Sequence, residues 1–217
     1  MIESVEDFRS NLNEIDILMS YARANQKSVA KYKLFIKTAI VLLCSHFEVF
    51  IEAFISEHVD VLKSCYNSGN MPQFMKDNYI DDTLKLFKSQ TAKGKNSRQL
   101  KALFKLHDSV SVKMSELSDL ELNLKFSIGK HGQKEVEHLF VKFGLDSFVE
   151  SQSFIEPFKL INSAIGIRNN IIHEGSAPTL TYEDLVKYKE AFRDFVNGLQ
   201  QHILTHQEQY YGRMYYM

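Results

Sequence analysis

Three polar residues near the end of one apolar segment have types that suit chemistry on a phosphodiester. Arg168, Asn169 and His173 lie in the stretch SFIEPFKLINSAIGIRNNIIHEG, which runs from Ser153 to Gly175. An arginine can grip phosphate oxygens with its planar guanidinium, and a histidine can take up or release a proton near neutral pH. Together with a polar amide, these groups could bind a phosphate and move the protons that its cleavage requires.

The segment that carries these residues is predicted to be a helix with apolar residues over most of its circumference. They recur at spacings of three and four in two rows: Phe158, Ile161, Ile165 and Ile172, and Leu160, Ala164, Ile167 and Ile171. The remaining narrow stripe is small or polar and consists of Asn162, Gly166, Asn169 and His173. Because burying an unpartnered guanidinium is costly, Arg168 requires either a partner or a function.

The spacing of the three residues decides which of them share a helix face. Arg168 and His173 are separated by about 140° of rotation, whereas Asn169 and His173 lie one turn apart on one face. Gly175 is a natural helix stop, so His173 is expected in the last turn, where backbone carbonyls favour a cation. The long arginine side chain, one turn earlier, is expected to reach the same end of the helix.

A second long helix is predicted from about Val29 to about Leu62. Its expected core residues are Leu34, Ala39, Leu42, Leu43, Phe47, Phe50, Ile51, Phe54 and Ile55, and its polar stripe is Thr38, Ser45, Glu48, Glu52 and Ser56. If the two long helices pack as neighbours, their polar stripes can face each other. Glu48 is then a partner of Arg168 at a functional site, an ordinary charge on a partly exposed stripe, or a member of a structural ion pair.

Length and composition favour one all-α domain. The chain has 217 residues, of which 44% are hydrophobic, and only 3 Pro and 9 Gly. A chain of this size can bury a sizeable core, and the scarcity of helix breakers favours helices over strands. We expect a helical bundle in one domain over residues 1–217, with a variable helical or loop insertion at about 67–152.

The remaining helices are predicted from apolar periodicity and from end signals. The first has its core row at Val5, Phe8, Leu12, Ile15, Met19 and Ala22, with Ser4 as the N-cap. A short helix from Lys134 to Phe143 is expected to end at Gly144, and the last helix runs from about Tyr182 to His206. The tyrosines of the tail, Tyr210, Tyr211, Tyr215 and Tyr216, either cover a subunit interface or fray.

Charge and cysteine usage limit the possible partners. The net charge of -1 gives no global attraction to nucleic acid, so a polyanion site has to be a local patch. The stretch from Lys85 to Lys105 has seven basic residues and no acidic one, and is either a phosphate-tracking arm or a solvated loop. Cys44 and Cys65 form neither a disulfide framework nor a metal site, which is typical of a reducing cytoplasm.

Two further classes of protein are disfavoured by the sequence. The N-terminal segment is acidic and amphipathic, unlike a secretory signal, and the apolar stretch from Leu34 to Ile55 is interrupted by charges, unlike a bilayer span. His202 and His206 stand four apart and could share a metal ion, but no convincing third ligand accompanies them. We therefore expect a cytoplasmic protein with no metal, no cofactor and no membrane partner.

The six residues Arg168-Asn-Asn-Ile-Ile-His173 resemble the signature of the HEPN superfamily. In that signature a histidine follows an arginine after four intervening residues, the first of them polar. The earlier apolar helix with an embedded glutamate, SHFEVFIEAF, and the length and helix order are also similar to this superfamily. Its members are all-helical domains of prokaryotic defence, toxin–antitoxin and RNA-processing systems. The chain is most similar to the free-standing HEPN-like nucleases, including the RiboL-PSP-HEPN branch.

This resemblance implies an up-and-down bundle core with extra helices inserted in its middle. It also implies a metal-independent endoribonuclease of toxin or phage-defence type that acts as a homodimer. Arg168 and His173 match the catalytic pair and Asn169 the supporting polar position, while we expect Glu48 to help hold them. The expected partners are RNA, a second copy of the chain, and an antitoxin or other defence-system protein. Gly175 stands where some HEPN toxins carry a modified tyrosine, so that form of control is not expected.

RNA cleavage by such a site needs no metal, because the 2′-OH is the nucleophile. One group takes the proton of the 2′-OH and another protonates the leaving 5′ oxygen. One chain offers one histidine in the motif, whereas a two-fold dimer offers two. Two alternatives stay open at this point: a non-catalytic HEPN module that binds RNA, a nucleotide or a protein, and a structural adaptor in which Arg168 pairs with a buried carboxylate.

Overall fold

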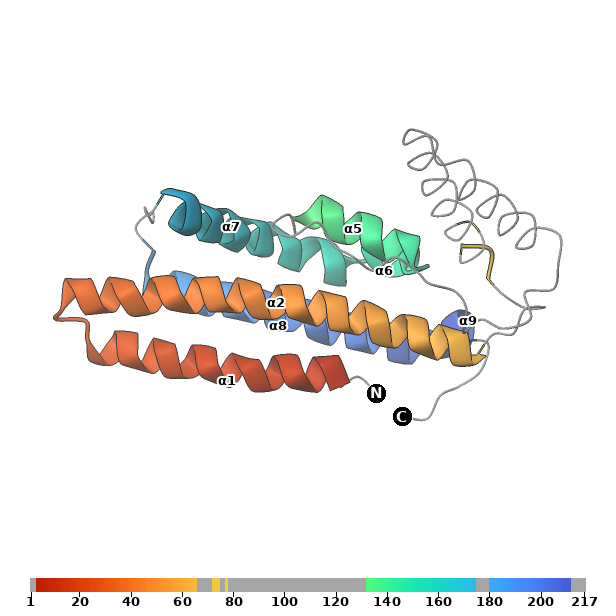
Figure 1. The fold of residues 1–217 in the computed structure, drawn as a ribbon, viewed down its shortest axis with the longest axis horizontal. Coiled ribbons are helices and arrows are strands. Elements are labelled where there is room, and N and C mark those ends of the chain that lie inside the picture. Colours follow the sequence, from red (N-terminus) through yellow and green to blue (C-terminus); the bar gives the residue numbers. More distant parts are fainter. Residues whose placement is uncertain (1–2, 66–71, 75–76, 78–131, 175–179, 212–217) are drawn as a thin grey trace, which may run out of the picture.

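The computed structural model describes residues 3–65, 72–74, 77, 132–174 and 180–211, and every regular element within these ranges is a helix. The helices are α1 (Glu3–Ala24), α2 (Val29–Cys65), α5 (Gln133–Lys142), α6 (Asp146–Val149), α7 (Gln152–Glu174), α8 (Tyr182–Thr205) and α9 (Gln207–Tyr211) (Figure 1). The predicted all-α fold is thus confirmed. The predicted insertion at about 67–152 falls mostly outside the described residues.

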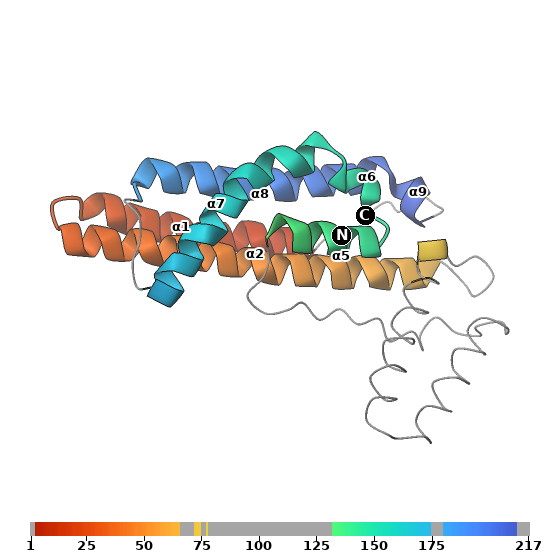
Figure 2. The same cartoon turned by 90° about the horizontal axis from the view of Figure 1, so that it is seen from above.

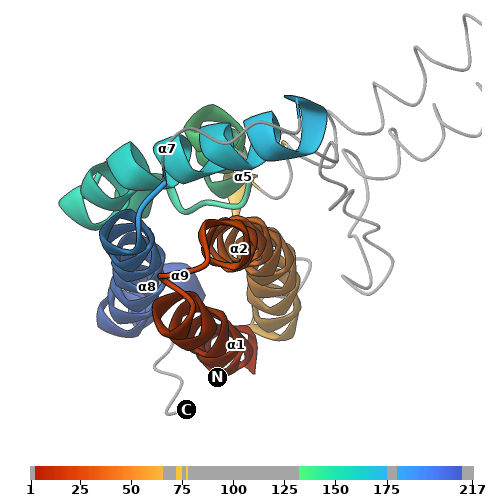
Figure 3. The same ribbon diagram turned by 90° about the vertical axis from the view of Figure 1, so that its left-hand side faces the viewer.

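Three long helices lie side by side, and a fourth crosses them. α1, α2 and α8 follow the long axis of the molecule, and α7 packs across α8 and α2 at an angle (Figures 2 and 3). α8 starts beside the start of α2, where the backbone N–H of Tyr182 donates to the Tyr32 hydroxyl at 2.8 Å. α1 therefore runs antiparallel to both α2 and α8.

A cluster of phenylalanine rings joins these four helices. Phe47 on α2 lies at its centre, with its ring centroid 4.9 Å from that of Phe192 on α8 and 6.2 Å from that of Phe158 on α7. Phe8 of α1 approaches the same ring edge-on at 6.5 Å. Since all four side chains are at most 1% exposed, the cluster fixes how α7 sits on the bundle.

The predicted core rows are correct where a helix faces its neighbours and wrong where it does not. All six predicted core residues of α1 are buried, but Ser4 is not an N-cap: it lies inside α1, and its backbone N–H and hydroxyl donate to the Glu57 carboxylate at 2.7 and 3.0 Å. On α2, Leu34 is 60% exposed although it was expected in the core. It lies on the outer face of α2, which no described helix covers.

The length and composition of α2 also match those of a membrane-spanning helix from Val29 to Leu62. Its apolar face is nevertheless used inside the protein, since Ile40, Leu43 and Ile51 are fully buried against the other helices. The core helix of a bundle meets the same criteria as a membrane span.

Two helix ends follow the expected chemistry. Gly144 has a φ of 78°, and the backbone N–H groups of Gly144 and Leu145 donate to the carbonyls of Val141 and Phe140 at 3.0 and 2.9 Å. This is a Schellman motif, and it confirms the predicted stop of α5. α8 begins at Thr181 with a reciprocal capping box to Asp184.

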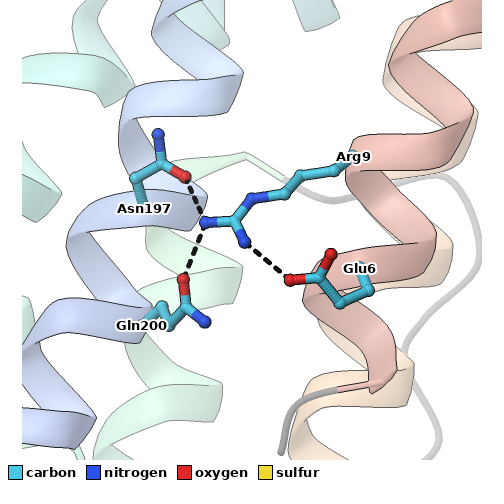
Figure 4. A network of polar contacts seen from close by, with 4 residues as sticks. All are labelled: Glu6, Arg9, Asn197 and Gln200. Carbon is cyan, nitrogen blue, oxygen red and sulfur yellow. Dashed lines mark hydrogen bonds and ion pairs between the residues drawn. The ribbon is translucent and has the colours of Figure 1, made fainter.

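A polar network ties α1 to α8 at the surface. One terminal nitrogen of Arg9 donates to the side-chain oxygens of Asn197 and Gln200 at 2.9 and 2.7 Å, and the other pairs with Glu6 at 2.7 Å (Figure 4). Because Arg9 is partly exposed, this network orients the two helices more than it stabilises them.

The C-terminal helix α9 is held to the bundle by a fully buried histidine. His58 on α2 is 3.1 Å from the carbonyl of Phe143 and 2.9 Å from the hydroxyl of Tyr211. A carbonyl can only accept, so Nε2–H donates to Phe143 and the neutral Nδ1 accepts from Tyr211. Burial lowers the pKa of His58 to about 4, against the smaller opposing effect of the Phe143 carbonyl.

The depressed pKa of His58 predicts a loss of stability in mild acid. The unfolded chain binds a proton at His58 below about pH 6.5, whereas the folded chain does so only near pH 4, so stability falls as the pH drops through this window. The loss amounts to about 3 kcal/mol. Urea unfolding between pH 7 and 4 measures it. The His58→Gln variant should take up about one proton fewer on unfolding than the wild type. If its free energy of unfolding depended on pH as the wild type's does, His58 would not be the group responsible.

Candidate functional site

The candidate site forms where α7 crosses α2. Arg168 is 9% exposed on the face of α7 that meets α2, and its Nη2 donates to Oε1 of Glu48 at 2.5 Å. Its Nη1 donates to Oδ1 of Asn169 at 3.0 Å. The predicted pairing of Glu48 with Arg168 is therefore present. The two helices are held together here by a largely desolvated ion pair, with 11% of the arginine and 22% of the glutamate side chain exposed.

The guanidinium of Arg168 is not fully used by its neighbours. No described residue accepts a hydrogen bond from its Nε, which is buried. Each terminal nitrogen carries two hydrogens and makes one hydrogen bond to a described residue, so each retains a second N–H. A buried donor without a partner is costly, which makes this cation unusual for a purely structural ion pair.

A buried thiol lies on the same face of α2 as the ion pair. Cys44 is one turn before Glu48, and its side chain is almost completely buried, as expected for a small apolar residue. Burial raises the pKa of the Cys44 thiol to about 12, although the charge of Arg168 lowers it, and the charge of Glu48 raises it further. The thiol is therefore protonated at neutral pH and adds no charge to the site.

Asn169 connects the ion pair to the exposed part of α7. Because its Oδ1 accepts from Arg168, the amide is oriented with its NH₂ group turned away from the guanidinium. Asn169 is half-buried and lies one turn before His173 on the same face. An oriented amide donor therefore stands next to the histidine.

His173 is exposed in the last turn of α7, as its position before a glycine predicted. Gly175 itself lies outside the described residues. α7 reaches past α2, so no helix of the described residues lies beneath its C-terminal end (Figures 2 and 3). Ile172 continues the bundle-facing row of Ile161 and Ile165 but is 54% exposed for this reason. Ile172 therefore belongs to an apolar row of α7 but lies outside the core, as does Leu160, which is 39% exposed.

The polar stripe of α7 lies mostly on its exposed face, so the prediction that it faces the polar stripe of α2 is wrong for Asn162, Gly166 and His173. Asn162 and Gly166 are exposed, and a Cβ atom at Gly166 would meet nothing within 4 Å. The stripe leads from the start of α5, where Asn162 accepts from the backbone N–H of Gln133 at 3.0 Å, to His173. The ion pair lies on one side of α7 and the histidine on another, about 140° away. Among the described residues, His173 is thus the one imidazole at the free end of α7.

His202 and His206 do not form a metal site within the described part of the chain. Their rings stack at 4.3 Å, and Nε2 of His202 is 3.1 Å from the Ser147 hydroxyl and 2.8 Å from that of Tyr210. Tyr210 is buried in this contact and Tyr211 against His58, so these two tail tyrosines close the C-terminal end of the bundle. Tyr215, Tyr216 and the basic stretch from Lys85 to Lys105 lie outside the described residues.

A comparison with protein families matches the chain to a known class of domain. The family model described as RiboL-PSP-HEPN matches residues 6–205, which cover α1 to the end of α8 and include the whole site. Comparison with curated proteins and with solved structures gave no match.

Proposed function

Because the chain belongs to the RiboL-PSP-HEPN family, we propose that it is a metal-independent endoribonuclease of toxin or phage-defence type. HEPN domains are often ribonucleases, and they commonly bind RNA and dimerise. The observation that carries the proposal is the arrangement around Arg168. A desolvated arginine with N–H groups to spare is held by Glu48 and Asn169, and Asn169 lies one turn from an exposed histidine.

In the proposed reaction the RNA 2′ oxygen attacks the adjacent phosphorus. The P–O bond to the 5′ oxygen breaks, leaving a 2′,3′-cyclic phosphate and a 5′-hydroxyl. Arg168 binds and orients the phosphate, and His173 moves a proton between the 2′-OH and the leaving oxygen. Asn169 and Glu48 hold the arginine in place.

A homodimer with the motif at its two-fold axis completes this mechanism, since two proton-transfer groups are needed and one chain supplies one. The free end of α7 supports such an arrangement. It carries His173 and the exposed Ile172, and it stands clear of α2, so a second copy has access to both.

The proposal is tested with purified protein and a labelled RNA in the presence of EDTA. We expect cleavage that the chelator does not reduce, with products that end in a 2′,3′-cyclic phosphate. Loss of wild-type activity on chelation would contradict the mechanism, as would products with a 3′-hydroxyl end. Addition of Mg²⁺ to the same reaction is the control.

One observation favours a second function, a HEPN module that binds RNA or another partner without cutting it. Arg168 is 9% exposed, and both its terminal nitrogens already donate to neighbouring side chains. In such a module the role of this covered arginine is to fix α7 against α2, and it does not contact the phosphate. In the same assay, RNA binding without product would favour the module.

A further inference from the structure

The hairpin of α1 and α2 ends in a surface that carries positive charge only. We define the hairpin tip as residues 17–37, from the last turns of α1 to the first turns of α2. It contains five basic residues and no acidic one: Arg23, Lys27, Lys31, Lys33 and Lys37. In a chain whose net charge is -1, this is a local concentration of cations.

Most of these cations have no local charge partner. Arg23, Lys27, Lys31 and Lys33 are exposed, and none of them pairs with a carboxylate of the described residues. The nearest acidic groups on α1 are already engaged: Glu14 lies 3.2 Å from His46, and Asp16 pairs with Lys189 at 2.5 Å. At the start of α8, Asp184 is held in the capping box, and the exposed Glu183 adds one negative charge nearby.

An exposed aromatic ring accompanies the charges. Tyr21 is 53% exposed, and its ring stacks on that of Phe35 with centroids 5.6 Å apart and planes 28° apart. The stack fixes one face of the tyrosine and leaves the remainder of the ring in solvent. A fixed aromatic ring among cations is the combination that holds single-stranded nucleic acid, because the bases stack and the phosphates pair.

The hairpin tip is connected to the candidate site along one face of α2. Lys37 and Glu48 are eleven residues apart, which is close to three helical turns, so they share a face at about 16 Å along the axis. Lys33 lies one further turn toward the tip. The turn between α1 and α2 and the free end of α7 lie in the same half of the molecule (Figure 1). A strand that leaves the Arg168–His173 site along this face of α2 therefore reaches Lys37 and Lys33. Lys31 and Phe35, on which Tyr21 stacks, lie about 160° further around α2, so the strand bends over the turn between α1 and α2 to reach them.

We propose that the hairpin tip binds the single-stranded RNA that leads to the Arg168–His173 site, with its lysines on the phosphates and Tyr21 on a base. This inference rests on the proposed function for the identity of the ligand. The lysines contact the RNA backbone and Tyr21 contacts the face of one base. The tip therefore sets the affinity and the direction of the RNA strand without reading its base sequence.

The test measures binding of fluorescein-labelled polyuridine by anisotropy, in the His173→Ala background so that the RNA is not cut. The variant Lys27→Gln/Lys31→Gln/Lys33→Gln removes three cations. The matched control, Lys134→Gln/Lys142→Gln/Lys159→Gln, removes three from α5 and α7. Three phosphate contacts are lost in the tip variant. We therefore expect the slope of the logarithm of the binding constant against the logarithm of the salt concentration to fall by about 2, and the affinity at roughly 0.1 M salt to fall about 100-fold. The control should change far less.

Tyr21 gives a second measurement in the same assay. Tyr21→Ala should weaken binding about 5- to 100-fold and Tyr21→Phe should retain it, since the ring and not the hydroxyl stacks on the base. Circular dichroism shows whether each variant is folded. Equal losses in Tyr21→Phe and Tyr21→Ala would overturn the stacking role.

Two results would overturn the inference as a whole. One is binding by the tip variant that equals that of the control variant. The other is tip-dependent binding to vesicles of phosphatidylserine and phosphatidylcholine with no tip dependence for RNA, which would make the tip a lipid-binding surface. The inference and the proposed function can be rejected separately. If the wild type cleaves RNA but binding does not depend on the tip, only the inference is rejected. If binding depends on the tip but the wild type does not cleave RNA, only the proposed nuclease activity is rejected.

Discussion

Replacing His173 with alanine is expected to lower the rate of RNA cleavage by about 10²–10⁴-fold, the range for loss of a positioned acid or base. The fold should be unaffected, because the imidazole is exposed in the last turn of α7 and contributes nothing to the core. Initial rates on a labelled RNA measure the effect. Circular dichroism and sedimentation show that the variant is folded and has the wild-type oligomeric state.

His138 provides the matched control for this substitution. It is also an exposed histidine on a helix, but it lies on α5, away from the crossing of α7 and α2. His138→Ala should cleave at the wild-type rate. Undiminished cleavage by His173→Ala would sink the proposed mechanism, and equal losses in the two variants would point to a nonspecific effect of removing an exposed histidine.

The sequence predicted the long helices well because their apolar periodicity is set by the core they face. The rows of α1, and residues such as Phe47 and Phe158, are buried where they were expected. The errors arise because periodicity reveals neither which face of a helix is covered nor where a neighbouring helix ends. Leu34 and Ile172 have core spacing but lie where α2 and α7 have no described neighbour, so they are exposed.

The candidate site was predictable in its parts but not in its contacts. The polar stripe of α2 pointed to Glu48, the cost of burying a cation pointed to a partner for Arg168, and the structure pairs the two at 2.5 Å. That Asn169 accepts from Arg168, and that the Nε of Arg168 finds no described partner, depends on side-chain rotamers and on the crossing of two helices. Ser4 shows the same limit, since its capping pattern is local but its partner, Glu57, lies on another helix.

The ion pair itself separates a catalytic arginine from a structural one. In Glu48→Ala the Arg168 cation loses its partner in a largely desolvated place, which should destabilise the protein by about 3 kcal/mol, the lower end for a broken buried pair. Replacing both charges together, as Glu48→Leu/Arg168→Met, removes the pair without leaving a charge behind. Such replacements are often neutral or stabilising, so we expect stability within about 1 kcal/mol of wild type. Urea unfolding measures both variants.

The activity of the double variant then decides what Arg168 does. If the arginine binds the phosphate, the restored protein is stable but cleaves RNA as poorly as His173→Ala, because no other group replaces the guanidinium. If Arg168 only fixes α7 against α2, the introduced leucine and methionine hold the two helices together equally well. Cleavage then returns together with stability. Full activity in the double variant would therefore reject the phosphate-binding role. Stability without activity would show that Arg168 is not purely structural, which agrees with its Nε, for which the described residues offer no hydrogen-bond acceptor.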